Sequence, residues 1–311
     1  MFSFLTEPNF PKAALGFERE SITALSLARE GKGMFGLKQA ATVELPANLL
    51  TPSFLERNIS NSRELAVLIE EAVRSAGLGG HKNWSVSLPS NTARSAIITL
   101  ENTSTGKDES EEILDWKAEQ VFGAPAAELR ITRNRIAADT DGRQRYFATA
   151  VKLSVIDEYE TIFENFGWKA GLILPRAVSE ANWIINDSKK SDMLLISSQS
   201  DGFSAILMRN GQPTVVRSVT CTESERADEV YRLLMFYQDR FAADAAGSLL
   251  ERILVVGKGL IPQKIREIST EAMGRALTVL RPDEVGLNLP VNALAFDDVA
   301  APAGLASLGW R

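Results

Sequence analysis

Cysteine and histidine are almost absent from this chain of 311 residues, which has one of each, Cys221 and His81. A single cysteine excludes an intrachain disulfide and is typical of a reducing compartment. One cysteine and one histidine also exclude a zinc site built from the usual ligands. A Ser-His-Asp triad would need His81, which lies in a predicted turn between Gly79 and Asn83. A catalytic role for His81 is therefore not expected.

The sequence also lacks a long apolar run and an excess of positive charge. No stretch approaches the ~20 apolar residues of a membrane helix, and the first residues lack the features of a signal peptide. The chain has 34 basic and 40 acidic side chains, for a net charge of -6, which disfavours nucleic acid as a partner. We therefore expect a cytoplasmic protein without a membrane span. An apolar cluster near the start is expected either to pack on the first sheet or to contact a membrane or partner; it comprises Phe2, Phe4, Leu5 and Phe10.

The remaining composition is that of a globular chain, with 45% hydrophobic and 24% charged residues. The first segment predicts three strands, an amphipathic helix from Ser62 and a fourth strand that Pro89 ends. The helix has apolar residues at helical spacing, and glycines at 77, 79 and 80 follow it. The predicted strands are 13–18, 21–28, 34–45 and 84–88.

A second segment has a different order of elements. It predicts strand, helix, two hairpin strands and helix, with Asp141-Gly142 as a hairpin signal. A further strand and helix follow, and the polar run 187–190 is the predicted domain boundary. The predicted elements are strand 96–100, polar loop 102–107, helix 109–121, strand 131–136, strand 143–153, helix 155–166, strand 170–174 and helix 176–185.

A third segment repeats the order of the first. Three strands are followed by a long helix, which is predicted to begin at Thr222 with Glu225 in a capping box. The later predicted elements are strand 252–256, a helix from Ile261, strand 276–280 and helix 301–308. Because strand, strand, strand, helix, strand occurs twice, we expect two mixed sheets flanked by helices that face each other across a cleft.

This duplicated α/β unit resembles the actin, Hsp70 and sugar-kinase superfamily, and within it the type IV pilus assembly protein PilM family. FtsA and the cytoplasmic part of GspL are relatives in that group. The resemblance covers nearly the whole chain in the right order. The stretches that carry it are 14–21, 86–89, 113–120, 229–240 and 254–259. The resemblance implies actin-like (ribonuclease H-like) lobes, a 1C-type insert and, because the chain passes directly from Cys221 into a helix, a missing or reduced 2B subdomain.

The resemblance also implies domain bounds. The first lobe would span 1–186, with the insert at about 89–167. The second lobe would span 187–299. A C-terminal helix at 300–311 would pack back on the first lobe.

An actin-like cleft would hold ATP with Mg²⁺ between two hairpin loops and an adenosine loop. Such loops need glycine for close approach to phosphate and aspartate for the metal. Here the first loop has glutamates where the family has Asp and Gly, and the second has Ser and Gln. The sequence therefore predicts a degenerate site without ATP hydrolysis and with no required cofactor or metal. The implied cleft residues are Glu18, Arg19, Ser21, Ser197, Gln199, Gly202, Gly257, Lys258 and Gly259. The glycine loop 257–259 could equally serve only tight strand-to-helix packing.

By resemblance, the expected function is that of a non-enzymatic scaffold of a type IV pilus or type II secretion platform at the inner membrane. A groove between the first subdomain and the insert would bind the cytoplasmic tail of a PilN-like single-span membrane protein, and other platform components would be further partners. The segments 94–100 and 143–153 are the expected region. Five hairpin arginines there are either a basic face for an acidic partner or a solvated surface: Arg130, Arg133, Arg135, Arg143 and Arg145. The alternative function is an active actin-like ATP-binding protein or kinase.

Overall fold

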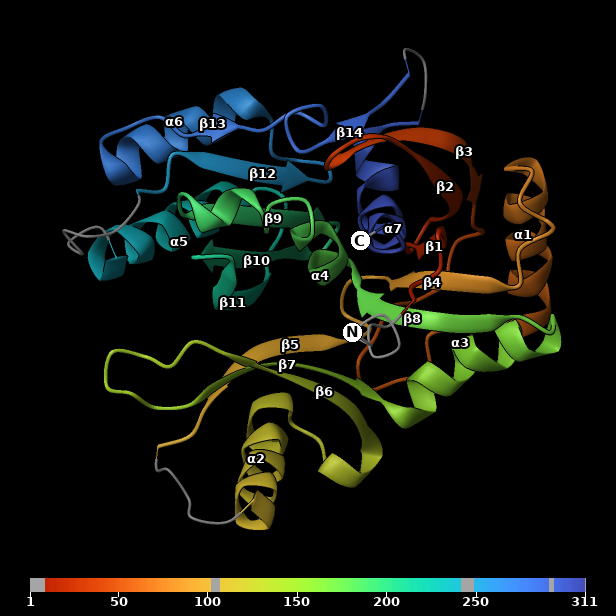
Figure 1. Ribbon diagram of the computed structural model, residues 1–311, viewed down its shortest axis with the longest axis horizontal. Helices are drawn as coiled ribbons and strands as arrows, with labels where there is room; N and C mark the ends of the chain where they lie inside the picture. Colours follow the sequence, from red (N-terminus) through yellow and green to blue (C-terminus); the bar gives the residue numbers. More distant parts are fainter. Residues whose placement is uncertain (1–8, 102–106, 242–248, 291–293, 311) are drawn as a thin grey trace, which may run out of the picture.

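A computed structural model describes residues 9–101, 107–241, 249–290 and 294–310. Two lobes, each built on its own sheet, lie side by side, and a third, smaller sheet lies against both (Figure 1). Of the apolar N-terminal cluster, Phe2, Phe4 and Leu5 lie outside the described residues, as does most of the polar loop predicted at 102–107. Within the described ranges, no helix is both long and apolar enough to cross a membrane.

The first lobe is a six-stranded mixed sheet in the order β14-β3-β2-β1-β4-β8. β1 and β2 form an antiparallel hairpin, while β4 runs parallel to both β1 and β8. Helices α1 and α3 cover one face, and α4 and α7 cover the other. The strands are β1 (Ala13–Phe17), β2 (Ser21–Gly31), β3 (Met34–Glu44), β4 (Asn83–Leu88), β8 (Lys169–Pro175) and β14 (Leu287–Asn288); the helices are α1 (Ser62–Ser75), α3 (Leu153–Asn165), α4 (Arg176–Ala181) and α7 (Phe296–Leu308).

The second lobe is a five-stranded sheet in the order β11-β10-β9-β12-β13. Its central strand β9 is buried almost throughout, because α5 and α6 pack on one face and α4 and α7 on the other. The strands are β9 (Met193–Gln199), β10 (Gly202–Arg209), β11 (Gln212–Thr220), β12 (Arg252–Val256) and β13 (Thr278–Val279); the helices are α5 (Arg226–Phe241) and α6 (Pro262–Met273), and a 3-10 turn spans Asp187–Lys189.

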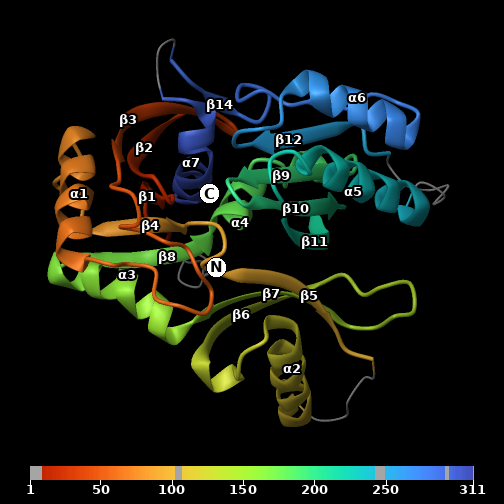
Figure 2. The same ribbon diagram turned by 180° about the vertical axis from the view of Figure 1, so that it is seen from behind.

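The two lobes share α4 and α7 as a common layer (Figure 2). α7 is made of small and apolar residues, and those from Val299 to Ser307 are all buried. A helix that is apolar on every side is stable only when it is covered on every side. This composition therefore fits a helix held between two sheets. The approach is close: a Cβ on Gly304 would collide with the Ser179 carbonyl of α4, and one on Gly16 with the Pro302 ring.

The third sheet interrupts the first lobe between β4 and α3. Its order is β5-β7-β6, and α2 packs on it to form a separate small core. In the described part of the chain, two hydrogen bonds join it to the second lobe: Arg145 Nη2 donates to the Thr214 carbonyl (2.9 Å), and the Ala137 amide donates to Gln212 Oε1 (2.6 Å). The elements are β5 (Arg94–Thr99), β6 (Leu129–Ile136), β7 (Arg145–Lys152), α2 (Lys107–Phe122) and a 3-10 turn at Ala126–Glu128.

Several predicted elements differ from the structure. α7 begins at Phe296 rather than 301, since Asp297 and Asp298 suit the positive end of a helix. α4 ends at Ala181, and the predicted strand 276–280 shrinks to β13. β14 was not predicted: it lies within the segment 187–299 but pairs in parallel with β3 of the first lobe.

The capping box at Thr222 forms only in part. Glu225 accepts the Thr222 amide (3.0 Å), but the Thr222 hydroxyl bonds the same carboxylate. The hydroxyl therefore does not cap the backbone, and α5 begins later, at Arg226.

Candidate functional site

Two neighbouring cavities lie where the lobes and the third sheet meet. The first, which we call the interlobe cleft, has a volume of about 410 Å³ and lies at the β1–β2 loop, the β9–β10 loop, the β12–α6 loop and the first turn of α7. The second, which we call the groove, has a volume of about 480 Å³ and lies between β5, the β10–β11 hairpin and α4. Pro52, Ser90, Asn91 and Arg176 line both.

Most residues of the predicted cleft do come together. The interlobe cleft is lined by seven of them: Glu18, Arg19, Ser21, Gln199, Gly257, Lys258 and Gly259. The other two lie elsewhere. Ser197 is fully buried beneath the cleft, and Gly202 starts β10, where a Cβ would collide with the Val219 carbonyl. Gly202 therefore serves the pairing of β10 with β11.

A buried arginine between two carboxylates forms the floor of the cleft. Arg176, the first residue of α4, donates from Nη1 to Glu18 (2.8 Å) and from Nε to Glu180 (2.7 Å). Burial raises the pKa of Glu18 to about 7, against the attraction of Arg176, and it also raises the pKa of Glu180. Burial alone would lower the pKa of Arg176, but the two carboxylates raise it above its ordinary value. The Glu18 carboxylate is thus bound by an internal cation.

A polar network closes the cleft on the side of the second hairpin loop. Asn91 donates to Asp201 (2.8 Å) and accepts from Gln199 (3.2 Å). Arg19 lies 3.8 Å from the same Asp201 carboxylate. These bonds link the first lobe directly to the β9–β10 loop across the cleft. Side chains from the two walls of the cleft therefore bond one another.

Arg226 connects two of the cleft loops from below. Its guanidinium is nearly buried and donates to the carbonyls of Gln199 (2.7 Å) and Lys258 (3.1 Å). A Cβ on Gly259 would collide with this guanidinium. The absence of a side chain at Gly259 therefore makes room for Arg226.

The glycine loop after β12 has a packing explanation as well. Gly257 has φ of +96°, and a Cβ there would collide with the Ser198 carbonyl. Its amide donates to Asp297 Oδ1 of α7 (2.7 Å), and Ser198 donates to the Lys258 carbonyl (2.7 Å). The Gly257 amide thus already has an acceptor within the chain.

The charges of the cleft fit a triphosphate poorly. Its lining has four cations, Arg19, Arg176, Arg226 and Lys258, and six carboxylates, which are Glu18, Glu20, Asp201, Glu223, Asp297 and Asp298. Burial and the neighbouring Asp297 raise the pKa of Asp298, as expected where like charges crowd. In the described part of the chain, no group of three or more histidine, cysteine or acidic side chains is arranged to hold a metal ion. A triphosphate in this cleft would therefore meet more carboxylates than cations.

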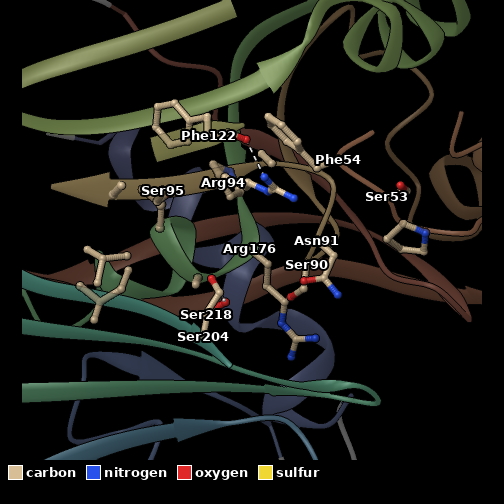
Figure 3. Close-up of a pocket in the computed structure, with 18 of the residues that line it drawn as sticks. Ser53, Phe54, Ser90, Asn91, Arg94, Ser95, Phe122, Arg176, Ser204 and Ser218 are labelled. Carbon is tan, nitrogen blue, oxygen red and sulfur yellow. Dashed lines mark hydrogen bonds between the residues drawn. The ribbon is translucent and has the colours of Figure 1, made fainter. Parts of the chain in front are cut away.

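The groove has a different character, with walls of mostly small, uncharged residues. Ser95 of β5 lies across from Ser204 and Ser218 of the hairpin, and Phe54 and Phe122 lie near Arg94 at one side (Figure 3). The groove takes in the start of the predicted segment 94–100, but 143–153 does not line it. Leu55 and Val121 also line it, although each is nearly half exposed.

The hairpin arginines are mostly engaged within the chain. Arg130 pairs with Glu160 of α3, Arg133 with Asp115 of α2, and Arg143 with Asp139. Arg145 donates to β11, as described above. These contacts favour the interpretation as a solvated, internally paired surface over a basic face for an acidic partner.

The chain matches known proteins in structure but not in sequence. No protein-family model matches the sequence, and no curated protein matches it. A chain of the solved structure described as a PilM-PilN type IV pilus biogenesis complex aligns at TM-score 0.71 with 15% identity, covering 98% of this chain and 100% of that one. The chain has the fold of PilM. The actin-like α/β fold predicted from the sequence is thereby confirmed; at this identity the likeness concerns the fold.

Two further structures align at TM-score 0.47. One is a Bacteroides thetaiotaomicron protein with an actin-like ATPase fold and unknown function, at 12% identity over 96% of this chain and 98% of that one. The other is the cytoplasmic domain of EpsL, an inner membrane component of the type II secretion system of Vibrio cholerae, at 9% identity over 96% and 93%.

Four cleft residues were missed by sequence reasoning: Asn91, Arg176, Arg226 and Asp297. Each bonds a partner that is distant in the sequence, and Arg176 lies 158 positions from Glu18. One local signal was present, because Arg176 and Glu180 are spaced as an ion pair on one helix face.

Proposed function

We propose that this chain is a non-enzymatic scaffold of a type IV pilus or type II secretion assembly platform. In this proposal it acts in the cytoplasm at the inner membrane, and it binds the short cytoplasmic tail of a PilN-like single-span membrane protein in the groove. The third sheet with α2 would be the counterpart of the 1C subdomain, and a 2B subdomain would be missing or reduced. Other platform components are further expected partners.

The observation that carries this proposal is the groove, in a chain with the fold of PilM. It is about as large as a pocket for a small ligand, and its lining is mostly neutral. Extended peptides commonly bind along an exposed sheet edge, where pockets take alternate side chains. The matching structure is described as a PilM-PilN complex, which supports a PilN-like protein as the partner.

The interlobe cleft supports the absence of ATP hydrolysis. Glu18 is bound by Arg176, and the Gly257 amide is bound by Asp297. A phosphate would have to displace these bonds and approach excess negative charge. The alternative function, an active ATP-binding protein or kinase, is tested by calorimetric titration with ATP and Mg²⁺. We expect no binding; micromolar binding would favour the alternative.

The scaffold proposal is tested by capture of the cytoplasmic tail of a PilN-like single-span membrane protein. We expect the full-length protein to bind the immobilised tail at low salt. The variant Leu55→Glu, at the groove, should weaken binding at least tenfold, since it places a charge in the apolar contact. The matched control is Val67→Glu, because Val67 is more exposed and lies on α1, away from the groove.

Two results would contradict the scaffold proposal. One is no capture by the wild-type protein. The other is equal loss of capture in both variants, which would indicate a general effect of the added charge.

A further inference from the structure

Two unpaired sheet edges border the groove. β5 is the end strand of the third sheet, and β11 is the end strand of the second lobe's sheet. They come within 8 Å of each other, measured between Cα atoms, but belong to separate sheets (Figures 1 and 2). Alternate amides and carbonyls of an end strand point away from its neighbour and are available to another chain.

Among the residues that the structure describes, one hydrogen bond joins the two edges, and it lies at one end. Arg145, opposite Thr99 of β5, reaches the Thr214 carbonyl near the start of β11. The groove lies toward the other end, where Arg94, Ser95 and Ala96 of β5 face the later part of β11. The first residues of β5 therefore line the groove and are exposed or half-buried.

The only charged side chains lining the groove, among the described residues, are two arginines. Arg176 is balanced by Glu18 and Glu180, as shown above. Arg94 donates to the Phe122 carbonyl (2.5 Å) and stacks on the Phe54 ring (4.3 Å), but within the described ranges it has no carboxylate partner. A guanidinium has five N–H donors, so most of those of Arg94 remain available. The groove thus carries one uncompensated positive charge in a protein whose net charge is negative.

The floor of the groove offers a further polar atom. The Ser90 hydroxyl is buried and has no hydrogen-bond partner in the described residues. A buried polar atom without a partner costs free energy unless a ligand or water satisfies it. Ser90 lies where the groove meets the interlobe cleft.

We propose that the groove binds an extended peptide segment of a partner protein, which adds as a strand along the free edge of β5 and places an acidic side chain on Arg94. This inference rests on the proposed function and specifies how the occupant is recognised. Backbone hydrogen bonds to β5 supply affinity without side-chain specificity. Specificity then comes from the carboxylate, which forms charge-assisted bonds to Arg94, and from apolar side chains against Leu55 and Val121.

The probe is a phage-displayed library of random short peptides selected against the full-length protein. We expect the selected peptides to share one aspartate or glutamate among alternating apolar residues. Binding of the best synthetic peptide, measured by fluorescence anisotropy, should weaken about tenfold or more in Arg94→Ala and only partly in Arg94→Lys. In an extended peptide, alternate backbone amides face β5. N-methylation of the amides that face β5 should weaken binding, whereas N-methylation of the other amides should not.

The matched control is Arg135→Ala. Arg135 is an exposed arginine on β6 of the same sheet, and it lies outside the groove. Circular dichroism and thermal unfolding of Arg94→Ala distinguish loss of the ligand contact from loss of the fold, and Arg94→Lys retains the charge if Arg94→Ala unfolds.

The inference is overturned by selected peptides without acidic residues, by equal binding to Arg94→Ala and wild type, or by insensitivity to N-methylation. These results are distinguishable from failure of the scaffold proposal. If Leu55→Glu weakens capture of the membrane-protein tail and Arg94→Ala does not, the scaffold proposal stands and this mode of recognition is rejected.

Discussion

At the scale of single residues, Glu18 is the most unusual side chain of the cleft. It is partly exposed, yet it bonds a buried arginine whose other partner is a second buried carboxylate. Two carboxylates sharing one cation in a poorly solvated place cannot both be ionised at little cost. Glu18 therefore binds a proton more readily in the folded chain than in the unfolded chain.

This gives the first prediction, on the pH dependence of stability. The pKa of Glu18 is raised from 4.5 to about 7, so the folded state holds more protons than the unfolded state between these values. The contribution of Glu18 is fully present below pH 4.5 and is lost as the pH rises toward 7. Urea unfolding across this range should show wild type losing stability relative to Glu18→Gln. Parallel pH profiles would contradict the raised pKa.

The same residue shows what the sequence could and could not predict about the site. The resemblance to the PilM family placed Glu18 and Arg19 at the cleft, because it assigns the loop between the first two strands to that position. The bond from Glu18 to Arg176 had no such signal, since it depends on how two segments 158 residues apart pack. Local patterns predict where a loop lies; they do not predict which distant side chain it meets.

At the scale of elements, the turn from β12 into α6 is held by close packing against β9. The sequence alone left open whether Gly257 serves a nucleotide or a tight turn. In the structure the Ser198 carbonyl occupies the space of a side chain at Gly257. Gly274, at the C-terminal cap of α6, also has a positive φ, but no atom lies within 4 Å of its Cβ position. A side chain at position 274 would therefore meet only backbone strain, whereas a side chain at position 257 would also collide with the Ser198 carbonyl.

The second prediction compares alanine at these two positions. Gly274→Ala should cost about 1 kcal/mol, since only the left-handed backbone is strained. Gly257→Ala should cost more, about 2–4 kcal/mol, because the carbonyl of Ser198 must also move. Urea unfolding of both variants without added nucleotide measures this. Equal small losses would mean that Gly257 is not required for packing.

Most strands and helices could be predicted, because their apolar residues follow a period of two or of helical spacing. The errors share a cause. β14 and β13 are two residues long each, too short for any period to show, and exist only because a neighbouring strand is present. α7 is apolar on all sides, so helical periodicity does not mark where it begins.

At the scale of the whole molecule, the third sheet contacts the second lobe through few polar bonds. Arg145 and Gln212 provide the two described above, and both cross between segments that are far apart in the sequence. Breaking them should leave each core intact while loosening the arrangement around the groove. Contacts of this kind add less to global stability than to the relative position of the sheets.

The third prediction is therefore on the double variant Arg145→Ala, Gln212→Ala. Hydrogen exchange should become faster in β5 and β11, with little change in the unfolding midpoint. The matched control is Arg143→Ala, which removes exposed ion pairs with Asp139 and Asp141 inside the hairpin loop. Unchanged exchange in the double variant, or equal acceleration in the control, would show that other contacts position the third sheet.

The return of the chain from the second lobe to β3 has a consequence for synthesis on the ribosome. β14 and α7 both follow residue 286, yet α7 covers the apolar face of the first sheet that contains Ala14 and Leu25. The strands that leave the ribosome first therefore keep one apolar face exposed to solvent until translation is nearly complete. The amino-terminal half is not a unit that can mature ahead of the rest, and a nascent chain stalled before residue 287 should need chaperone protection.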